Sequence, residues 1–421
     1  MKSFIRLLTL VLAFSLTGEI ASAAEREKGL FEFRDGDRVV LLGGTFIERM
    51  QNDGYFETMV TASYPHGNIT FRNLGWSGDT VWGDSRAVFG TRADGFKRLV
   101  ADVKLCQPTV IIVCYGENEA FAGPDGLGDF RAGLNTLLDA LEATGARIVL
   151  LGPHPHINIG PPLPDPTQHN EHLRQYIEVT KQAAMDRKHW FFDLYSNLEK
   201  PIKQAEADPR IGAHANFAKK AVFTENGIHL HDHGNVAVGR FLLSWLAASP
   251  THWEVHIDLE SGTPNATGAT VTEVAVSEKG VSFTAVDREL ADIFSAGAGT
   301  ATIWLQGLGP GTYQAFANGK LLGDEDGMRR LEGPVEKIGF YRETAVARME
   351  QLRQTIIEKN QLFFHRYRPQ NETYLFLFRK HEQGNNAVEI PQFDPLIAEK
   401  EAKIAEIRKP LKQKFEIIKV K

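Results

Sequence analysis

Between Arg38 and about Trp245, short apolar runs alternate with longer segments in which apolar residues recur at helical spacing. The runs are RVVLLG, ITFRNLG, TVIIVCYG, ARIVLLGP and WFFDL. Continuous runs rich in Val, Ile and Leu are typical of parallel strands that are buried on both faces. Helical patterns at 130–144 and 170–187 predict crossover helices between such strands. The pattern therefore predicts an open α/β sandwich with a parallel sheet, which we assign to residues 24–250.

From about Trp253 the pattern changes to short alternating segments with many Gly, Thr and Val, such as WEVHIDL, TVTEVAVS, GVSFTAV and ATIWLQGL. Alternation with period two indicates antiparallel strands, and Asn318-Gly319 is a favourable two-residue hairpin turn. We expect a β-rich accessory module at residues 251–325. It is either a structural spacer or a glycan-binding module, and fold analogy alone supports the second role.

Residues 326–421 read as a helical C-terminal extension. The pattern predicts a helix at 335–361, an irregular arm at 360–390 and a charged helix at 395–408. The arm is rich in polar side chains, which predicts either a lid over a cleft or a network that ties the arm to the main domain. No internal repeat is apparent.

The N-terminus resembles an export signal. Lys2 and Arg6 precede an apolar stretch, and Ala21-Ser22-Ala23 is a cleavage pattern for secretory signal peptides. We therefore expect a signal peptide at residues 1–23 and a periplasmic or extracellular protein, with an uncleaved anchor as the alternative. The apolar stretch is shorter than the roughly 20 residues of a membrane span, so we expect no membrane span after cleavage.

The charge and the cysteine content of the chain exclude two classes of protein, those that bind nucleic acid through a basic stripe and those held together by disulfides. The net charge is −6 with both signs interspersed, so the sequence offers no basic stripe for nucleic acid. Cys106 and Cys114 are the two cysteines, at opposite ends of CQPTVIIVC. An extended run would separate them by roughly 25 Å, whereas a disulfide needs about 6 Å between Cα atoms. We expect buried thiols, and an apolar content of 43% supports a large core.

Polar and glycine residues follow the predicted strands where chemistry is expected. Open parallel sheets bind ligands beyond the carboxyl ends of their strands. Thr45 follows the first run in Gly43-Gly44-Thr45, Gly78 follows the second in GWSGDT, and Asn118 follows the third in GENE. His229 comes near the end of the domain, in TENGIHLHDHG.

These four blocks, in this order, resemble the SGNH (GDSL-type) hydrolases over about residues 39–243. The C-terminal RYRPQNETY and KHEQGNNA resemble secreted planctomycete-type members of that superfamily. The resemblance implies a flavodoxin-like three-layer sandwich and hydrolysis of carboxylic esters without a cofactor. Thr45 stands where the family has serine, and Asn226 stands where it has aspartate.

The resemblance also implies roles for these residues in acyl transfer. Thr45 would attack the ester carbonyl, His229 would take the hydroxyl proton, and Asn226 would orient His229 through its carbonyl oxygen. The oxyanion hole would consist of the Thr45 and Gly78 backbone N–H groups and the Asn118 amide. Threonine adds a methyl group that restricts the nucleophile, and asparagine lacks the charge of aspartate.

Further residues close to these blocks are expected to line the pocket. They are Trp76, Ser77, Glu117, His154 and His156. Ser77 is also an alternative nucleophile, although its block supplies oxyanion donors in the family.

Two other motifs compete with this interpretation. The literal Gly83-Asp84-Ser85 is a decoy in our interpretation, because no apolar run leads into it. His229, His231 and His233 have the alternating spacing of metal ligands on a strand. Because this string leads into a predicted helix, which would spread the side chains apart, we do not expect a metal site.

The sequence therefore predicts an exported hydrolase of carboxylic esters, for instance of acetyl groups on a polysaccharide. The substrate would be a small-molecule or polysaccharide ester, and the sequence names no protein partner. A catalytically weak or inactive SGNH-fold protein that binds a glycan or a protein is the alternative, favoured by Thr45 and Asn226.

Overall fold

The structure is a computed structural model that describes residues 30–207, 223–246, 252–290, 294, 299–322, 328–331, 335–382 and 386–420. The expected signal peptide at 1–23 lies outside these ranges. None of the helices within them combines the length and apolar character needed to cross a membrane.

The predicted parallel sheet is present, and its strands fall on the predicted apolar runs. Its order is β2-β1-β3-β4-β5, with every neighbouring pair parallel. This is the strand order of flavodoxin-like folds. The strands are β1 (Arg38–Gly43), β2 (Thr70–Asn73), β3 (Val110–Cys114), β4 (Arg147–Gly152) and β5 (Trp190–Asp193).

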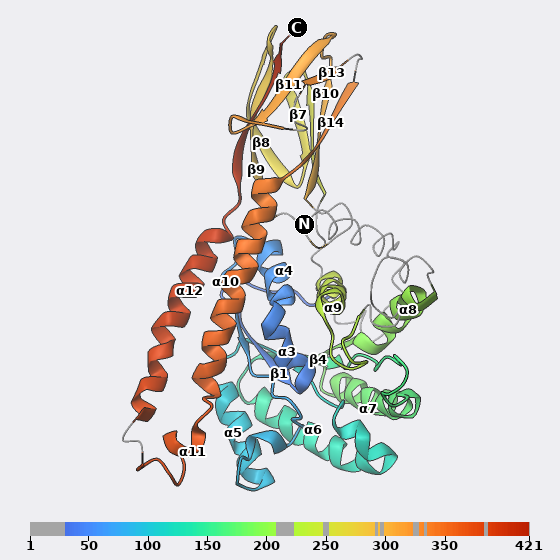
Figure 1. Cartoon of the computed structure of the whole chain (residues 1–421), viewed down its shortest axis with the longest axis vertical. Helices are drawn as coiled ribbons and strands as arrows, with labels where there is room; N and C mark the ends of the chain where they lie inside the picture. The colour runs from blue at the N-terminus through green and yellow to red at the C-terminus, as the bar shows by residue number, and fades with distance from the viewer. Residues whose placement is uncertain are drawn as a thin grey trace.

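Helices cover both faces of this sheet, so the predicted three-layer α/β sandwich is confirmed (Figure 1). Successive side chains of β1 enter opposite cores: Val39 and Leu41 pack in one, Val40 and Leu42 in the other. The first core includes residues of α3 (Thr45–Asp53), α4 (Tyr55–Ser63), α8 (Leu194–Ala207) and α9 (Asp232–Trp245). The second includes residues of α5 (Arg92–Leu105), α6 (Leu127–Glu142) and α7 (Thr167–Asp186).

A β-sandwich lies at the other end of the molecule (Figure 1). Apolar side chains of its two sheets, such as Val255 and Phe415, share one core. One sheet has the order β14-β10-β6-β7, and the other β12-β11-β15-β9-β8, with β13 paired to β11. The strands are β6 (Trp253–Asp258), β7 (Thr263–Thr267), β8 (Ala269–Ser277), β9 (Gly280–Asp287), β10 (Thr300–Gln306), β11 (Gly311–Ala317), β12 (Lys320–Leu321), β13 (Met328–Leu331), β14 (Val335–Tyr341) and β15 (Lys412–Lys419).

The predicted limits of this module, 251–325, are wrong because β13, β14 and β15 lie beyond them. The helix predicted from Val335 begins instead at Glu343, and the seven residues Val335–Tyr341 form β14. These residues pair along their length with β10 and bury Ile338 and Phe340 against the sandwich core. Pairing with β10 therefore makes these residues a strand, although their own sequence pattern predicted a helix.

The helical extension consists mainly of α10 (Glu343–Tyr367) and α12 (Phe393–Ile407), which lie side by side along the α/β domain (Figure 1). The predicted irregular arm is shorter than expected, since α10 continues to Tyr367. It also contains the short helix α11 (Glu372–Leu375) and a 3-10 segment at Asn386–Gln392.

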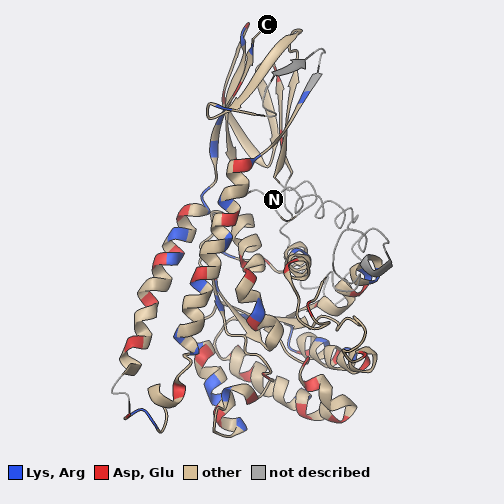
Figure 2. Cartoon of the chain, viewed as in Figure 1, with Lys and Arg blue, Asp and Glu red and all other residues tan. Residues whose placement is uncertain are grey.

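Lys and Arg residues alternate with Asp and Glu residues over the α/β domain and along α10 and α12 (Figure 2). Both cysteines are free thiols; Cys114 is buried, as predicted, and Cys106 is partly buried.

Candidate active site

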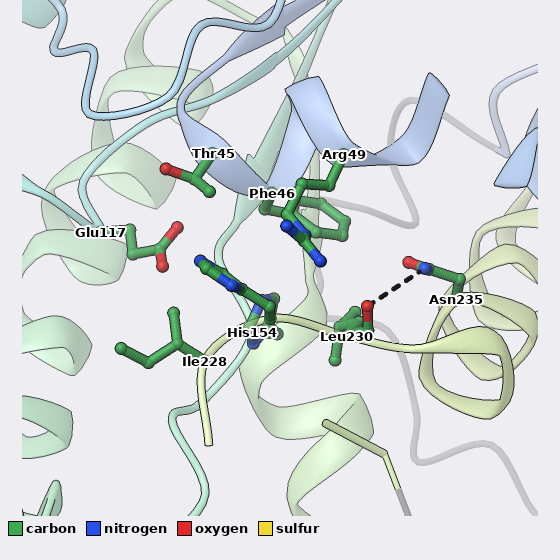
Figure 3. Close-up of a pocket in the computed structure, with 9 residues that line it drawn as sticks. Thr45, Phe46, Arg49, Glu117, His154, Ile228, Leu230 and Asn235 are labelled. Atoms are coloured by element: carbon green, nitrogen blue, oxygen red, sulfur yellow. Dashed lines mark hydrogen bonds between the residues drawn. The ribbon is translucent and has the colours of Figure 1, made fainter. Parts of the chain in front are cut away.

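The carboxyl ends of β1, β3 and β4 surround a small pocket (Figure 3). Its cavity volume is ≈ 10 Å³, which is space for about one water molecule. The lining residues are Thr45, Phe46, Arg49, Glu117, His154, Ile228, His229, Leu230 and Asn235.

Thr45 is the first residue of α3, immediately after the two-glycine turn that ends β1. The turn needs Gly43, because a Cβ there would lie 2.3 Å from the Cys114 carbonyl oxygen. Close packing of β1 against β3 thus fixes where α3 begins. The Thr45 hydroxyl oxygen accepts a hydrogen bond from the Gly78 backbone N–H at 3.2 Å.

The other expected oxyanion donor lies against the same turn. The Asn118 amide nitrogen donates to the Asp79 carbonyl oxygen at 2.7 Å and would lie 3.1 Å from a Cβ placed on Gly44. Asp79 is itself fixed below the site by a fully buried ion pair with Arg86. The fold therefore brings Thr45, Gly78 and Asn118 together, as the sequence predicted.

Asn226 does not orient His229 in the expected way. Its side-chain oxygen accepts hydrogen bonds from the backbone N–H groups of Ile228 at 3.1 Å and His229 at 2.9 Å. Its amide nitrogen faces the Nδ1 atom of His229 at 3.4 Å. The expectation that the Asn226 carbonyl oxygen accepts from His229 Nδ1–H is therefore wrong, because the tight local turn already uses that oxygen.

His229 lines the pocket, but within the described ranges it forms no hydrogen bond to Thr45. Burial lowers its pKa below the ordinary value, and the Arg49 guanidinium lowers it further. The carboxylates of Glu117 and Glu225 oppose this shift without reversing it. His229 is therefore held in its neutral form, which suits proton transfer.

Glu117 supplies a carboxylate to the pocket, and Figure 3 shows it facing Thr45. His156 donates to it from Nε2 at 3.2 Å. Burial alone would raise the pKa of Glu117, but this hydrogen bond and the neighbouring imidazoles outweigh it, so its pKa is lowered. His154 also lines the pocket, with a pKa lowered by burial and with its Nδ1–H donating to the Pro155 carbonyl oxygen at 3.1 Å.

Trp76, Ser77 and His156 are not among the lining residues, in contrast to the expectation. The backbone N–H and the hydroxyl of Ser77 both donate to Glu48, at 2.7 and 2.9 Å. Trp76 is buried, with the Arg368 guanidinium 3.9 Å from its ring centroid. These contacts of Trp76 and Ser77 support the loop that carries Gly78.

The end of α10 and the C-terminal arm that follows it strengthen the same loop. Tyr367 donates from its hydroxyl to the Gly75 carbonyl oxygen at 2.7 Å, and Arg368 forms an ion pair with Glu48 at 2.6 Å. Arg98 of α5 forms a bidentate ion pair with Glu372 of α11. Of the two roles that the sequence left open for the arm, the structure shows the network that ties it to the domain.

Sequence reasoning missed Arg49 and several apolar lining residues. Arg49 lies four residues after Thr45 on α3, so helical periodicity could have placed it on the same face. It reaches into the pocket (Figure 3). Its guanidinium also forms an ion pair with Glu225 at 3.0 Å. Ile228 and Leu230 flank His229, so their place at the pocket could have been inferred from it, whereas nothing in the local pattern of Asn235 in α9 predicts its position.

The sequence offered His229, His231 and His233 as alternative metal ligands. Among the described residues, no three or more His, Cys, Asp or Glu side chains lie close enough together to hold a metal ion. His231 precedes the first turn of α9, and its ring lies nearly perpendicular to that of His233.

Residues 48–237 match the model of the GDSL-like Lipase/Acylhydrolase family. Over these residues the chain is similar to that family. The family comprises ester hydrolases. The matched residues include Gly78, Asn118, Asn226 and His229, but they begin after Thr45. The turn that presents the candidate nucleophile therefore lies outside the matched residues of this GDSL-like domain.

One solved structure shares the fold over nearly the whole chain, and others are similar to part of it. A gut microbial diltiazem-metabolizing enzyme is 16% identical and matches with a TM-score of 0.66, covering 93% of this chain and 99% of its own. An acetylxylan esterase from Geobacillus stearothermophilus is 18% identical, with a TM-score of 0.39, and covers 52% of this chain and 98% of its own. No curated protein matches the chain.

Proposed function

We propose that this protein is an exported hydrolase that removes small acyl groups, such as acetyl, from a hydroxyl-rich alcohol such as a polysaccharide. The convergence of the Thr45 hydroxyl, the Gly78 N–H and the Asn118 amide carries this proposal. These groups meet beside a pocket that His229 lines, within a domain of an ester hydrolase family. Export rests on Lys2, Arg6 and the Ala-x-Ala pattern ending at Ala23.

The chemistry follows from the positions of these groups. The Thr45 oxygen attacks the ester carbonyl carbon, and His229 takes the hydroxyl proton. The Thr45 and Gly78 N–H groups and the Asn118 amide stabilise the oxyanion, and one such donor contributes roughly 10²- to 10³-fold in rate. Expulsion of the alcohol leaves an acyl-threonine, which a water molecule hydrolyses to the free acid and the restored hydroxyl.

The lining of the pocket suits a polar alcohol. The walls carry the Glu117 carboxylate, which can accept hydrogen bonds from hydroxyl groups, and the Arg49 guanidinium, which can donate them.

A second candidate function is a binding protein of low or no catalytic activity, with a glycan or a protein as its ligand. The contact between the Asn226 amide nitrogen and His229 Nδ1 favours this candidate, because a catalytic base needs the opposite arrangement.

Hydrolysis of p-nitrophenyl acetate by the purified protein tests the first candidate. Thr45→Val keeps the shape of the side chain and removes the hydroxyl, and His229→Gln removes the base. We expect each variant to lower kcat by at least about 10²-fold and a chelator to have no effect. Equal rates in wild type and both variants would instead support the binding function.

A further inference from the structure

We propose that Asn226 holds His229 in the tautomer that carries its proton on Nε2. The imidazole then presents an N–H donor to the pocket, where a catalytic base would present a lone pair. The tautomer follows from the surroundings of His229, above all from its contact with Asn226, whereas its effect on hydrolysis rests on the proposed function.

The orientation of the Asn226 amide is fixed by its backbone partners. Its oxygen accepts from the N–H groups of Ile228 and His229 at 3.1 and 2.9 Å. Exchanging oxygen and nitrogen would direct the amide hydrogens at two N–H donors, and an amide nitrogen accepts no hydrogen bond. The NH₂ group therefore faces His229.

This orientation determines which ring nitrogen of His229 is protonated. The Asn226 nitrogen lies 3.4 Å from Nδ1, and it can only donate. A favourable contact requires a lone pair on Nδ1, because an Nδ1–H would point its hydrogen at the hydrogens of the amide. Burial and Arg49 keep the pKa of His229 low, so the ring is neutral and its single N–H is on Nε2.

The remaining nitrogen is the one available for chemistry. Since Nδ1 faces Asn226, Nε2 on the far side of the ring is left for the pocket that His229 lines. A general base must offer a lone pair there to take the Thr45 proton. Hydrolysis in the wild-type protein must therefore pass through the minor tautomer, with the proton moved to Nδ1.

A carboxylate at position 226 would reverse this arrangement. One oxygen of Asn226→Asp would keep the two backbone hydrogen bonds, and the other would accept from His229 Nδ1–H. In the serine-protease template, the aspartate-to-asparagine change lowers kcat about 10⁴-fold through the wrong tautomer. We expect Asn226→Asp to raise kcat for p-nitrophenyl acetate by roughly 10²- to 10⁴-fold.

Nitrogen-15 NMR of histidine-labelled protein above the pKa of His229 tests the tautomer directly, without any activity measurement. The His229→Gln variant identifies the His229 signals by their loss. We expect the proton on Nε2 in wild type and on Nδ1 in Asn226→Asp. A wild-type His229 protonated on Nδ1 would overturn the proposal, and this result needs no folded variant at position 226.

The kinetic experiment separates this inference from the proposed function. An Nε2–H tautomer in wild type together with faster hydrolysis by Asn226→Asp supports both. The same tautomer with no gain in Asn226→Asp supports the role of Asn226 and contradicts His229 as the base. The intact mass of the wild-type protein must be measured as a control. Deamidation of Asn226, which precedes Gly227, would itself place a carboxylate at this position.

Discussion

Single side chains decide the charge and protonation of the candidate site. His229 lies between the Arg49 guanidinium, which lowers its pKa, and the carboxylates of Glu117 and Glu225, which raise it. Burial is the largest cause, and it also favours the neutral ring. As a result, His229 becomes protonated at a lower pH than an ordinary histidine, whose pKa is 6.5. Any activity that needs the neutral ring should therefore be lost only below that pH.

Opposite charge changes next to His229 should shift its pKa in opposite directions. Arg49→Gln removes a repelling cation, so we expect the pKa of His229 to rise. Glu225→Gln removes an attracting carboxylate, so we expect the pKa to fall. A pH titration of the His229 ring signals by NMR measures both changes. Shifts in the same direction would show that loss of the Arg49–Glu225 ion pair, and not charge, controls the ring.

At the scale of elements, α10 joins the helical extension to the α/β domain through a buried ion pair. Lys359 pairs with Glu57 of α4 and also donates to the Phe71 carbonyl oxygen of β2 at 3.1 Å. Burial raises the pKa of Glu57 and lowers that of Lys359, so each charge depends on the other. Asn360 donates to the second oxygen of Glu57 at 3.2 Å.

Removing one member of this pair should cost more than removing both. Lys359→Met leaves Glu57 buried without its cation, which we expect to lower the free energy of unfolding by about 3–5 kcal/mol. The double variant with Glu57→Gln should regain most of this loss, because no uncompensated charge remains. Urea unfolding of the single and double variants measures the difference. Equal stabilities would contradict the dependence of Glu57 on Lys359.

For the whole molecule, the β-sandwich is completed by a segment far away in the sequence. The chain forms strands β6–β14, continues through α10 and α12 along the α/β domain, and returns as β15 (Figure 1). β15 lies between β9 and β11, and it pairs with both. The sandwich and the helical extension are therefore linked within one fold.

Substitutions on the two faces of β15 test this closure. Phe415 is 0% exposed and Ile418 is 40% exposed. Phe415→Asp places an unpaired charge in the sandwich core, which should lower stability by several kcal/mol, whereas Ile418→Asp should change it by about 0.5 kcal/mol or less. Thermal unfolding and limited proteolysis should show early loss of residues 253–341 in Phe415→Asp. Equal behaviour of the two variants would mean that β15 does not complete this core.

Prediction from the sequence succeeded for the strands of the parallel sheet, where the local residue pattern reflects burial in the fold. The runs around Val39–Leu42 predicted central strands because both faces of such strands are buried. It failed at Val335–Tyr341, whose sequence pattern is helical and continues into the helix α10. These residues form a strand because they pair with β10. It also failed at Lys412–Lys419, whose partner strands end more than 90 residues earlier.

The sequence by itself determined the parallel sheet, the resemblance to GDSL-like hydrolases and the edge of the sheet at which Thr45, Gly78, Asn118 and His229 lie. These features follow from the spacing of apolar residues along the chain and from the order of short motifs, and both can be read from local sequence. Tertiary structure alone decided that Arg49 and Glu225 flank His229 and that the arm supports the Gly78 loop. It also decided which atom of Asn226 faces His229, because that depends on the backbone groups that the folded turn brings to its oxygen.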